Sequence, residues 1–294
     1  MPRLPILVKQ LPLHASESGI LLDLVPDHIG WNYAGLKVLR LGVAEFFSGE
    51  VRDEEVVIVI LSGRADIKTS WGDFLNVGGR RTVFDGLPFA LYLPPDCSYT
   101  LFANTALELA LASANLAKQK DLPAFPAHLI PPYEVQVEDY GDANASRQIY
   151  HIVKPEFRAH KIMVAEVLTP SGNWASYPPH KHDRLDLPEE TELEEIFYYR
   201  IDGMNGFAIQ RVYTKDRDLD ETLVLSDGDA IAVPEGYHLM VAAHGYWVYY
   251  LSVMAGVSRS LAASDDPDHA WIRKIWRSRF PPTVTRAGKT NEFN

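Results

Sequence analysis

Three histidines and one glutamate are the side chains of this sequence best suited to chemistry. His180 and His182 lie in the stretch Ser176–Asp183, which reads Ser-Tyr-Pro-Pro-His-Lys-His-Asp. If this stretch is a strand, both imidazoles project from one face, because strand side chains alternate. Glu195 begins an aromatic and β-branched run, and His238 ends a short apolar strand closed by a Pro/Gly turn. Three imidazoles and one carboxylate on strands suit a divalent metal such as Zn, Mn, Fe or Ni.

A lone His-X-His pair is only weak evidence for a metal site. The order of the elements that follow it in this sequence makes that evidence stronger. Here the pair is followed by a strand that starts with Glu195, and then by Gly-X5-Pro-X-Gly-X-His, which ends at His238. The two elements, in this order, resemble the two motifs of the cupin superfamily. In cupins the first motif supplies His, His and Glu, and the second supplies the last His. The acidic insert Asp183–Glu194 is longer than in most cupins, and we expect it to form a loop beside the site.

Composition and charge restrict the class of protein. The chain has 294 residues, 47% of them hydrophobic, which is enough for two modest domains or one large β-barrel and argues against global disorder. The formal net charge of −11 argues against nucleic-acid binding, which needs a basic surface. An anionic substrate would therefore need local positive charge.

Sequence signals also bear on the compartment. Cys97 is the single cysteine, so the chain has no disulfide framework and no Cys-rich metal site. The first residues lack the apolar core of a signal peptide. No uncharged apolar run reaches the roughly 18–20 residues that a membrane helix needs. We expect a cytoplasmic protein with no membrane partner.

Strand-like runs dominate two parts of the chain. Residues 31–116 contain short β-rich runs separated by Gly, Asp, Asn and Pro, and residues 147–256 repeat this pattern. Such spacing is typical of antiparallel sandwiches or barrels. Residues 1–30 and 117–146 are rich in proline, and we interpret them as an N-terminal segment and a linker.

Residues 257–294 differ in pattern from the β-rich segments. Acidic N-cap signals and an early proline precede apolar residues that fall on one helical face, which predicts a short helix. The face that carries Trp271 and Trp276 could pack on its own barrel or on a second subunit, so a homo-oligomer is one option.

The two β-rich segments resemble copies of each other. At an offset of 140 positions, Glu54–Val56 matches Glu194–Ile196, Gly63 matches Gly203, and Pro94 matches Pro234. In this alignment Arg40, Gly42 and Ser98 stand where the second copy has its histidines, and only Glu55 is kept. A lone carboxylate cannot hold a transition metal well, so we predict a structural first domain without a metal site and a catalytic second domain.

Several longer stretches narrow the resemblance. They are Gly30–Tyr33, Arg81–Gly86, Ser176–Asp183, Leu193–Glu195, Gly206–Thr214, Val233–His238, Tyr249–Gly256 and Asp266–Trp271. Together they resemble the 5-deoxy-glucuronate isomerases of myo-inositol catabolism, a bicupin family and sister of the 4-deoxy-5-ketouronate isomerases of pectin breakdown. Two positions beside the ligands depart from the family pattern: Leu239 replaces the usual proline, and Ser252 replaces the usual asparagine.

The resemblance implies a fold and an activity. The fold is all-β, with two tandem cupin (jelly-roll-like β-barrel) domains and a short C-terminal helix. One divalent metal ion per chain would be held by His180, His182, Glu195 and His238. The family reaction converts 5-deoxy-D-glucuronate, an aldehyde, into 2-deoxy-5-keto-D-gluconate, a ketone.

This aldose–ketose isomerisation moves hydrogen between adjacent carbons. A cation chelated by the carbonyl and hydroxyl oxygens would act as a Lewis acid and stabilise an enediolate. Four protein ligands leave positions open on a five- or six-coordinate ion, which favours Mn, Fe or Ni over a closed tetrahedral Zn. A proton route needs a general base, whereas a metal-assisted hydride shift does not. The candidate bases, among which the sequence does not choose, are Lys181, Asp183, Tyr199, Tyr213 and Tyr237.

An anionic sugar acid also needs a cation for its carboxylate. Arg211 and Arg200 are the first candidates, because a guanidinium can grip a carboxylate with two hydrogen bonds. Strand alternation places Arg200 on the face opposite Glu195, and lets only one of Gln210 and Arg211 face a pocket.

Three other functions stay open at this stage. The same ligand set serves cupin dioxygenases and oxidases. The changes at Leu239 and Ser252 allow an isomerase of a related deoxy-uronate. A non-enzymatic storage or sugar-binding bicupin fits less well, because storage bicupins usually lose their ligands in both halves. His151, His160 and His244 are expected to have structural or surface roles.

Overall fold

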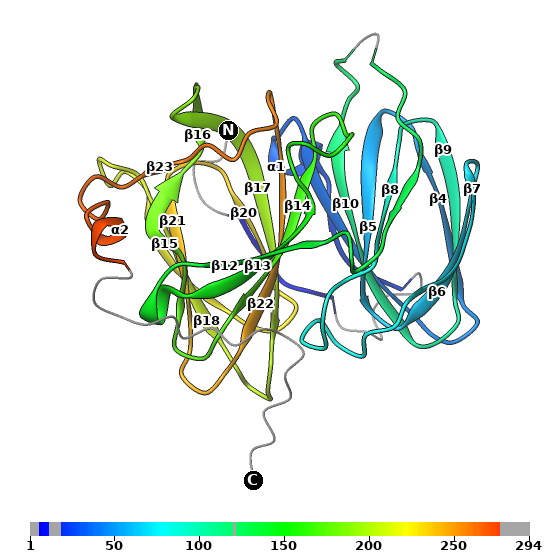
Figure 1. The fold of residues 1–294 in the computed structure, drawn as a ribbon, viewed down its shortest axis with the longest axis horizontal. Helices are drawn as coiled ribbons and strands as arrows, with labels where there is room; N and C mark the ends of the chain where they lie inside the picture. The colour runs from blue at the N-terminus through cyan, green and yellow to red at the C-terminus, as the bar shows by residue number, and fades with distance from the viewer. Residues whose placement is uncertain (1–5, 12–18, 120–121, 277–294) are drawn as a thin grey trace.

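Antiparallel strands form two barrels that lie side by side in the computed structural model, which describes residues 6–11, 19–119 and 122–276 (Figure 1). The helices are single turns: α1 (Pro26–Ile29), α2 (Ile272–Ile275) and the 3-10 turn η2 (Ala143–Ala145). The predicted all-β class with two tandem barrels and a short C-terminal helix is confirmed. No helix in the described part of the chain is long and apolar enough to cross a lipid bilayer.

The N-terminal barrel combines a six-stranded sheet and a four-stranded sheet. The larger sheet has the order β11 (His128–Ile130), β8 (Ala90–Leu93), β5 (Glu54–Ser62), β10 (Leu107–Asn115), β3 (Ala34–Leu41) and β2 (Ile20–Leu24). The smaller sheet has the order β4 (Phe46–Val51), β9 (Cys97–Ala103), β6 (Arg64–Thr69) and β7 (Gly72–Gly78). Apolar side chains fill the space between the two sheets.

The C-terminal barrel has the same plan with a larger inner sheet. Its order is β1 (Ile6–Val8), β20 (Ala230–Val233), β17 (Glu190–Ile201), β22 (Val248–Gly256), β14 (Met163–Thr169), β13 (Arg147–Val153) and β12 (Gln136–Tyr140), with β16 (Asp183–Asp186) paired to β17. The facing sheet has the order β19 (Asp220–Leu225), β18 (Ala208–Tyr213), β21 (Tyr237–Ala242), β15 (Trp174–Lys181) and β23 (Ser264–Asp265).

The segments outside the two β-rich regions contribute strands to both barrels. The segment 1–30 contains β1, which pairs with β20 of the C-terminal barrel, and β2, which pairs with β3 of the N-terminal barrel. The segment 117–146 contains β11, paired with β8, and β12, paired with β13.

The insert Asp183–Glu194 forms the β16–β17 hairpin, so the expectation of a loop was wrong. The buried carboxylate of Glu190 closes this hairpin by accepting the amides of Asp183 and Arg184, both at 3.0 Å.

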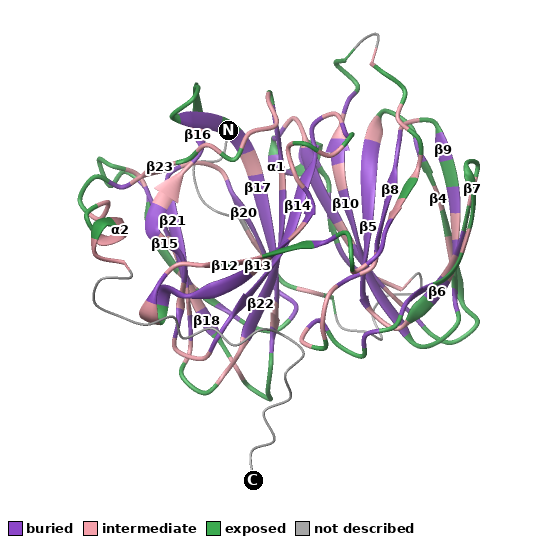
Figure 2. Ribbon diagram, viewed as in Figure 1, coloured by how far each residue is buried: buried purple, intermediate pink, exposed green. Residues whose placement is uncertain are grey.

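The two larger sheets pack face to face, and the buried residues between them form the largest apolar core of the described chain. Figure 2 shows this burial along the central strands of both barrels. Strand alternation explains how one strand serves two cores. On β5, Val56 and Ile58 face the interior of the N-terminal barrel, while Val57 and Val59 face the other barrel.

Two glutamates, the buried Glu55 and the half-buried Glu194, tie the barrels together reciprocally. Glu55 of the N-terminal barrel accepts the backbone amides of residues 160–162, at 2.6 to 2.8 Å, and the Tyr92 hydroxyl at 2.9 Å. Glu194 of the C-terminal barrel accepts the amides of residues 32–34, at 2.7 to 2.9 Å. Charge-assisted bonds of this kind are stronger than neutral ones. Each carboxylate therefore fixes the chain just before a strand of the opposite barrel.

A buried ion pair adds to this interface. The Arg80 guanidinium donates to both carboxylate oxygens of Glu166, at 2.9 and 2.5 Å, and Tyr249 donates to the same carboxylate at 2.9 Å. Arg80 also donates to the carbonyl of Ile60 at 3.0 Å. Because every oxygen of the buried carboxylate is bonded, the pair fixes the relative position of the barrels rather than leaving an isolated charge.

The strand registers correct the predicted correspondence between the two copies. Glu55 faces the other barrel, as Glu194 does, so it is not the counterpart of Glu195. The side of β5 that corresponds to Glu195 carries Val56 and Ile58. The offset of 140 was one position out along this strand, and a shift of one residue exchanges the two faces of a strand.

The predicted counterparts of the histidines were also wrong. Arg40 lies on β3 and donates to Glu108 at the interface, and Gly42 follows β3. Ser98 is exposed, whereas its neighbours Cys97 and Tyr99 face the barrel core. The interior positions of β4 and β9 therefore hold apolar and aromatic residues where the C-terminal barrel has imidazoles.

The Glu55 contact can be tested by Glu55→Gln, which removes the charge and replaces one acceptor oxygen by a donor. We expect the free energy of unfolding to fall by about 2–4 kcal/mol, because buried amides lose a charged acceptor. Urea unfolding followed by tryptophan fluorescence measures this change. Glu50→Gln, at a side chain that is 59% exposed, is the matched control. Equal stability of the two variants would contradict a role for Glu55 in joining the barrels.

Candidate metal centre

Strands from both sheets of the C-terminal barrel bring the four predicted ligands together. His180 on β15 lies directly opposite His238 on β21 in the strand pairing. Glu195 reaches the same point from β17 in the facing sheet, and His182 lies between β15 and β16. The pairing of β15 with β21 is irregular between Ala175 and His180, so the chain bulges just before the first histidine.

The side chains of this cluster are close enough to share one ion. The ligand nitrogens of the three histidines all lie within 4.8 Å of one another. One carboxylate oxygen of Glu195, Oε2, is 2.8 Å from Nε2 of His182 and 3.4 Å from Nε2 of His238. His238 and Glu195 are buried, with exposed fractions of 1% and 5%, whereas His180 is partly exposed. The cluster is therefore more open on the His180 side.

Neighbouring groups orient these side chains. Nδ1 of His182 is 3.3 Å from the carbonyl of Leu193, and Nδ1 of His238 is 3.3 Å from the carbonyl of Gly236. For His238 this contact favours a proton on Nδ1 and leaves Nε2 as the electron-pair donor that a metal needs, whereas Nε2 of His182 lies against Glu195. Ser252 donates to the other oxygen of Glu195 at 2.6 Å, which holds Oε2 toward the histidines.

One atom of the cluster has an unmet bonding capacity. Within the described chain, Nε2 of His238 is buried and has no hydrogen-bond partner. Buried polar atoms are almost always bonded, so an orphan nitrogen beside two more imidazoles and a carboxylate fits a metal ligand.

The electrostatics favour the ligating forms of His180 and Glu195, whereas they favour protonation of His182. Burial, together with the adjacent His238 and His182, lowers the pKa of His180 well below its usual value, so this imidazole is neutral at neutral pH. Burial alone would raise the pKa of Glu195, but the contacts with His182 and His238 hold it below its usual range. Burial opposes protonation of His182 as well, yet the hydrogen bond to Glu195 raises its pKa overall.

The predicted proton-transfer residues occupy different faces of the barrel. Lys181 donates to Asp183 at 2.5 Å and to Glu190 at 2.7 Å, on the side of β15 away from the ligands. The other carboxylate oxygen of Asp183 accepts the amide of Gly236 at 2.7 Å and so fixes the turn before His238.

Two of the three predicted tyrosines face outward from the same sheet. Tyr213 and Tyr237 pack with Leu239 in a separate small cluster, and Tyr213 donates to Asp266 at 2.6 Å. Tyr199 alone is inside the barrel, where its hydroxyl donates to Gln210. Burial raises the pKa of Tyr199 well above its usual value, so it remains a donor at neutral pH.

The predicted carboxylate-binding arginines lie outside the barrel interior. Arg211 is paired with Asp220 at 2.7 and 2.8 Å on the outer face of β18, and its neighbour Gln210 faces inward. Arg200 lies at the domain interface, where it is paired with Glu108 and Asp227.

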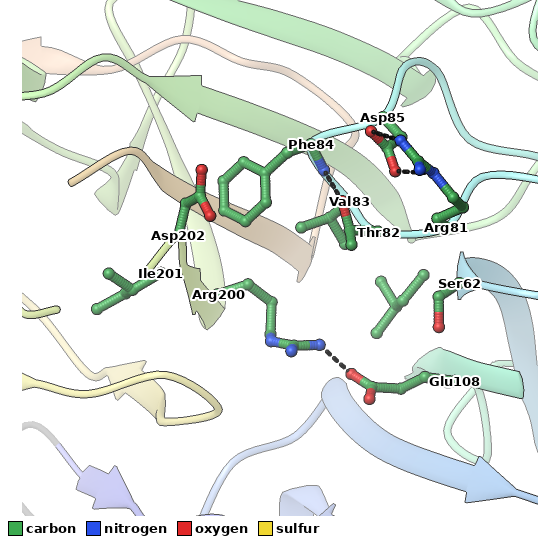
Figure 3. Close-up of a pocket in the computed structure, with 11 residues that line it drawn as sticks. Ser62, Arg81, Thr82, Val83, Phe84, Asp85, Glu108, Arg200, Ile201 and Asp202 are labelled. Carbon is green, nitrogen blue, oxygen red and sulfur yellow. Dashed lines mark hydrogen bonds and ion pairs between the residues drawn. The ribbon is translucent and has the colours of Figure 1, made fainter. Parts of the chain in front are cut away.

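Arg200 lines a separate cavity of about 520 Å³ between the barrels. Figure 3 shows Arg200 directed toward Glu108, with Phe84 and Asp202 beside each other on the side away from Glu108. The metal cluster does not line this cavity, so the cavity is not the pocket of the predicted ligands.

Sequence reasoning missed two interior residues of the C-terminal barrel. Ser252 was noted only as a departure from the family pattern. Side-chain alternation on β22 points it to the same face of the sheet as Glu195, to which it is hydrogen-bonded. Arg147 was not considered, although it begins a strand whose alternate residue Ile149 packs in the barrel core. Strand alternation alone could have identified both.

This chain is similar to known proteins over most of its length. The model of the KduI/IolB family matches residues 6–272. A 5-deoxy-glucuronate isomerase of Geobacillus kaustophilus is 42% identical over 264 residues, which cover 89% of this chain and 94% of the relative. A 5-deoxy-glucuronate isomerase of Bacillus subtilis is 34% identical over 270 residues, covering 90% and 98%.

Solved structures show the same architecture. An IolB-like protein from Salmonella typhimurium superposes with a TM-score of 0.85 at 35% identity, covering 91% of this chain and 98% of that one. Oxalate decarboxylase of Bacillus subtilis superposes with a TM-score of 0.59 at 14% identity, covering 85% and 76%. The second likeness concerns the fold alone.

Metal content tests the cluster directly. We expect the purified protein, loaded with a divalent ion and desalted, to keep one ion per chain, and His238→Ala to lose most of it. The reason is that the variant removes the buried nitrogen with no other partner. Plasma mass spectrometry measures the content. His128→Ala, at a side chain that is 47% exposed in the N-terminal barrel, is the control. Equal metal content in both variants would show that His238 is not a ligand.

The contact between Ser252 and Glu195 predicts a smaller effect. Ser252→Ala should weaken metal affinity by about 10- to 100-fold, since a carboxylate that has lost its outer hydrogen bond is less well oriented. Competition with a chelator of known affinity measures the change. An unaltered affinity would mean that the strand alone positions Glu195.

Proposed function

The chain belongs to the KduI/IolB family, and we propose that it is a metal-dependent aldose–ketose isomerase of the cytoplasm that converts 5-deoxy-D-glucuronate into 2-deoxy-5-keto-D-gluconate in myo-inositol catabolism. The observation that carries this proposal is the cluster of three histidines and one glutamate inside the C-terminal barrel. Relatives called 5-deoxy-glucuronate isomerase, which match about nine tenths of this chain, support the choice of substrate.

We infer that His180, His182, Glu195 and His238 hold one divalent ion. When bound, the ion would supply Lewis-acid stabilisation of negative charge on the oxygens of two adjacent substrate carbons. Four ligands are too many for an open tetrahedral site, which favours a five- or six-coordinate ion such as Mn, Fe or Ni over Zn. The open side next to His180 is where a substrate could approach.

The interior side chains of the barrel limit what else can enter. Phe197 lies against His238, with ring centres 5.7 Å apart, and against Tyr250 at 5.4 Å. These rings exclude water from the wall behind the ligands, which strengthens electrostatic interactions in the pocket. Tyr199, held protonated by burial, orients Gln210 by its hydrogen bond.

Turnover with and without metal tests the proposal. We expect the metal-loaded protein to convert 5-deoxy-D-glucuronate, with loss of the aldehyde signal in NMR spectra. Conversion should stop after chelation and return with one particular divalent ion, since the ligand set is the only cluster of its kind in the described residues. His182→Ala should lower kcat/KM by at least about 100-fold, as expected for loss of a group that stabilises the transition state.

Two outcomes would contradict the proposal. Absence of turnover by metal-loaded protein, with conversion of another deoxy-uronate, would assign a related substrate. Oxygen consumption with the substrate, and no turnover under anaerobic conditions, would instead assign a cupin dioxygenase or oxidase that uses the same ligands.

A further inference from the structure

Arg147, the first residue of β13, is a buried cation that has no hydrogen-bonded carboxylate partner among the described residues. Its exposed fraction is 6%. Nη1 donates to the carbonyl of Ala145 at 3.3 Å, and the guanidinium carbon lies 4.7 Å from the ring centre of Tyr140. The buried Nε has no hydrogen-bond partner in the described chain. Burying a charge without a counter-charge is costly, so this arrangement needs an explanation.

The strand register places Arg147 on the inner face of the C-terminal barrel. Ile149, two residues along β13, packs on the barrel core, whereas Tyr150 packs on the core between the barrels. Ile149 lies opposite Val167, which lies opposite Tyr250 on the face that also carries Glu195. Alternation therefore puts Arg147 on the same face of the sheet as the carboxylate ligand.

A chain of contacts connects Arg147 to the open side of the metal cluster. Asp265 on β23 lies opposite His180 in the strand pairing and is bonded to Arg273. Arg273 also donates to the hydroxyl of Tyr140, whose ring packs on Arg147. Arg147 is thus connected, through Tyr140, Arg273 and Asp265, to the edge strand that pairs with His180, the least buried ligand.

The other basic groups near this region already have partners. Arg273 is paired with Asp265, and Arg211 with Asp220. Lys161 is bonded to the carbonyls of Gly256 and Val257. Arg147 differs from these cations in that its buried Nε has no hydrogen-bond partner within the described residues.

We propose that Arg147 binds the carboxylate of the substrate and makes the pocket selective for sugar aldehydes with a terminal carboxylate. The inference rests on the proposed isomerase function. Ala145 occupies Nη1, which leaves the edge formed by Nε and Nη2 for two parallel hydrogen bonds to a carboxylate. A negatively charged chain thereby provides its anionic substrate with local positive charge on the face of the sheet that carries Glu195.

Kinetics with a charged and a neutral substrate test this inference. We expect Arg147→Gln to raise KM for 5-deoxy-D-glucuronate by about 10- to 150-fold, the value of a hydrogen bond to a charged group, with a much smaller change in kcat. The neutral analogue, in which the carboxylate is reduced to an alcohol, should be used equally by the variant and the wild type. Arg147→Lys should be intermediate, because it keeps the charge without the paired geometry.

The controls separate this inference from loss of fold and from failure of the proposed function. Arg52→Gln removes an arginine whose side chain is 80% exposed in the N-terminal barrel and should leave both substrates unaffected. Thermal unfolding and metal content of each variant identify loss of fold. An unchanged KM and unchanged preference in folded Arg147→Gln would overturn the inference while leaving the isomerase function intact.

A binding measurement decides the case in which the wild type shows no turnover. That result would contradict the isomerase function, and calorimetry with D-glucuronate and D-glucose would then test Arg147 alone. Tighter binding of glucuronate than of glucose by the wild type, lost in Arg147→Gln and kept in Arg52→Gln, would support a carboxylate subsite. Equal binding of both sugars by the wild type would overturn it.

Discussion

The alternation of side chains along β17 is the constraint on which the rest of the molecule depends. Glu195, Phe197 and Tyr199 face the interior of the C-terminal barrel, whereas Glu194 and Ile196 face the N-terminal barrel. One strand therefore carries the candidate ligand and the interface contact on adjacent residues. A slip of one position would exchange the two faces and place Glu195 at the interface.

This constraint explains why a barrel without imidazoles at the equivalent positions remains part of the molecule. The inner sheet of the C-terminal barrel has an apolar outer face that includes Ile196, Tyr198 and Leu251, and the N-terminal barrel covers it. Burial of this size is the main favourable term in joining two domains. The carboxylates of Glu55 and Glu194 then set the position of one barrel on the other, because each bonds backbone amides of the opposite barrel.

Sequence reasoning reached the fold and the identity of the clustered side chains, and the reasons are physical. Side-chain alternation along a strand can be recognised in a short stretch of sequence. The short β-rich runs, and the His-X-His pair followed by a strand that begins with Glu195, were therefore predictable. The predicted alignment of the two barrels was wrong along β5 because it depends on strand register. An error of one residue aligned Glu55, which lies at the interface, with Glu195. The partners of the two arginines could not be predicted for a related reason: Arg200 and Arg211 are paired with carboxylates on other strands and turns, which local sequence patterns do not identify.

Charge pairing across the whole molecule also explains why Arg147 stands out. A chain with a net charge of −11 has more carboxylates than cations, so a basic side chain readily finds an acidic partner at the surface or at an interface. Arg80, Arg200 and Arg273 all do so while partly or fully buried. Among the described residues Arg147 contacts a carbonyl and an aromatic face and has no hydrogen-bonded carboxylate, so it is stabilised least when the pocket is empty and most when an anion enters. The same arrangement that lowers its contribution to folding makes it selective for a carboxylate.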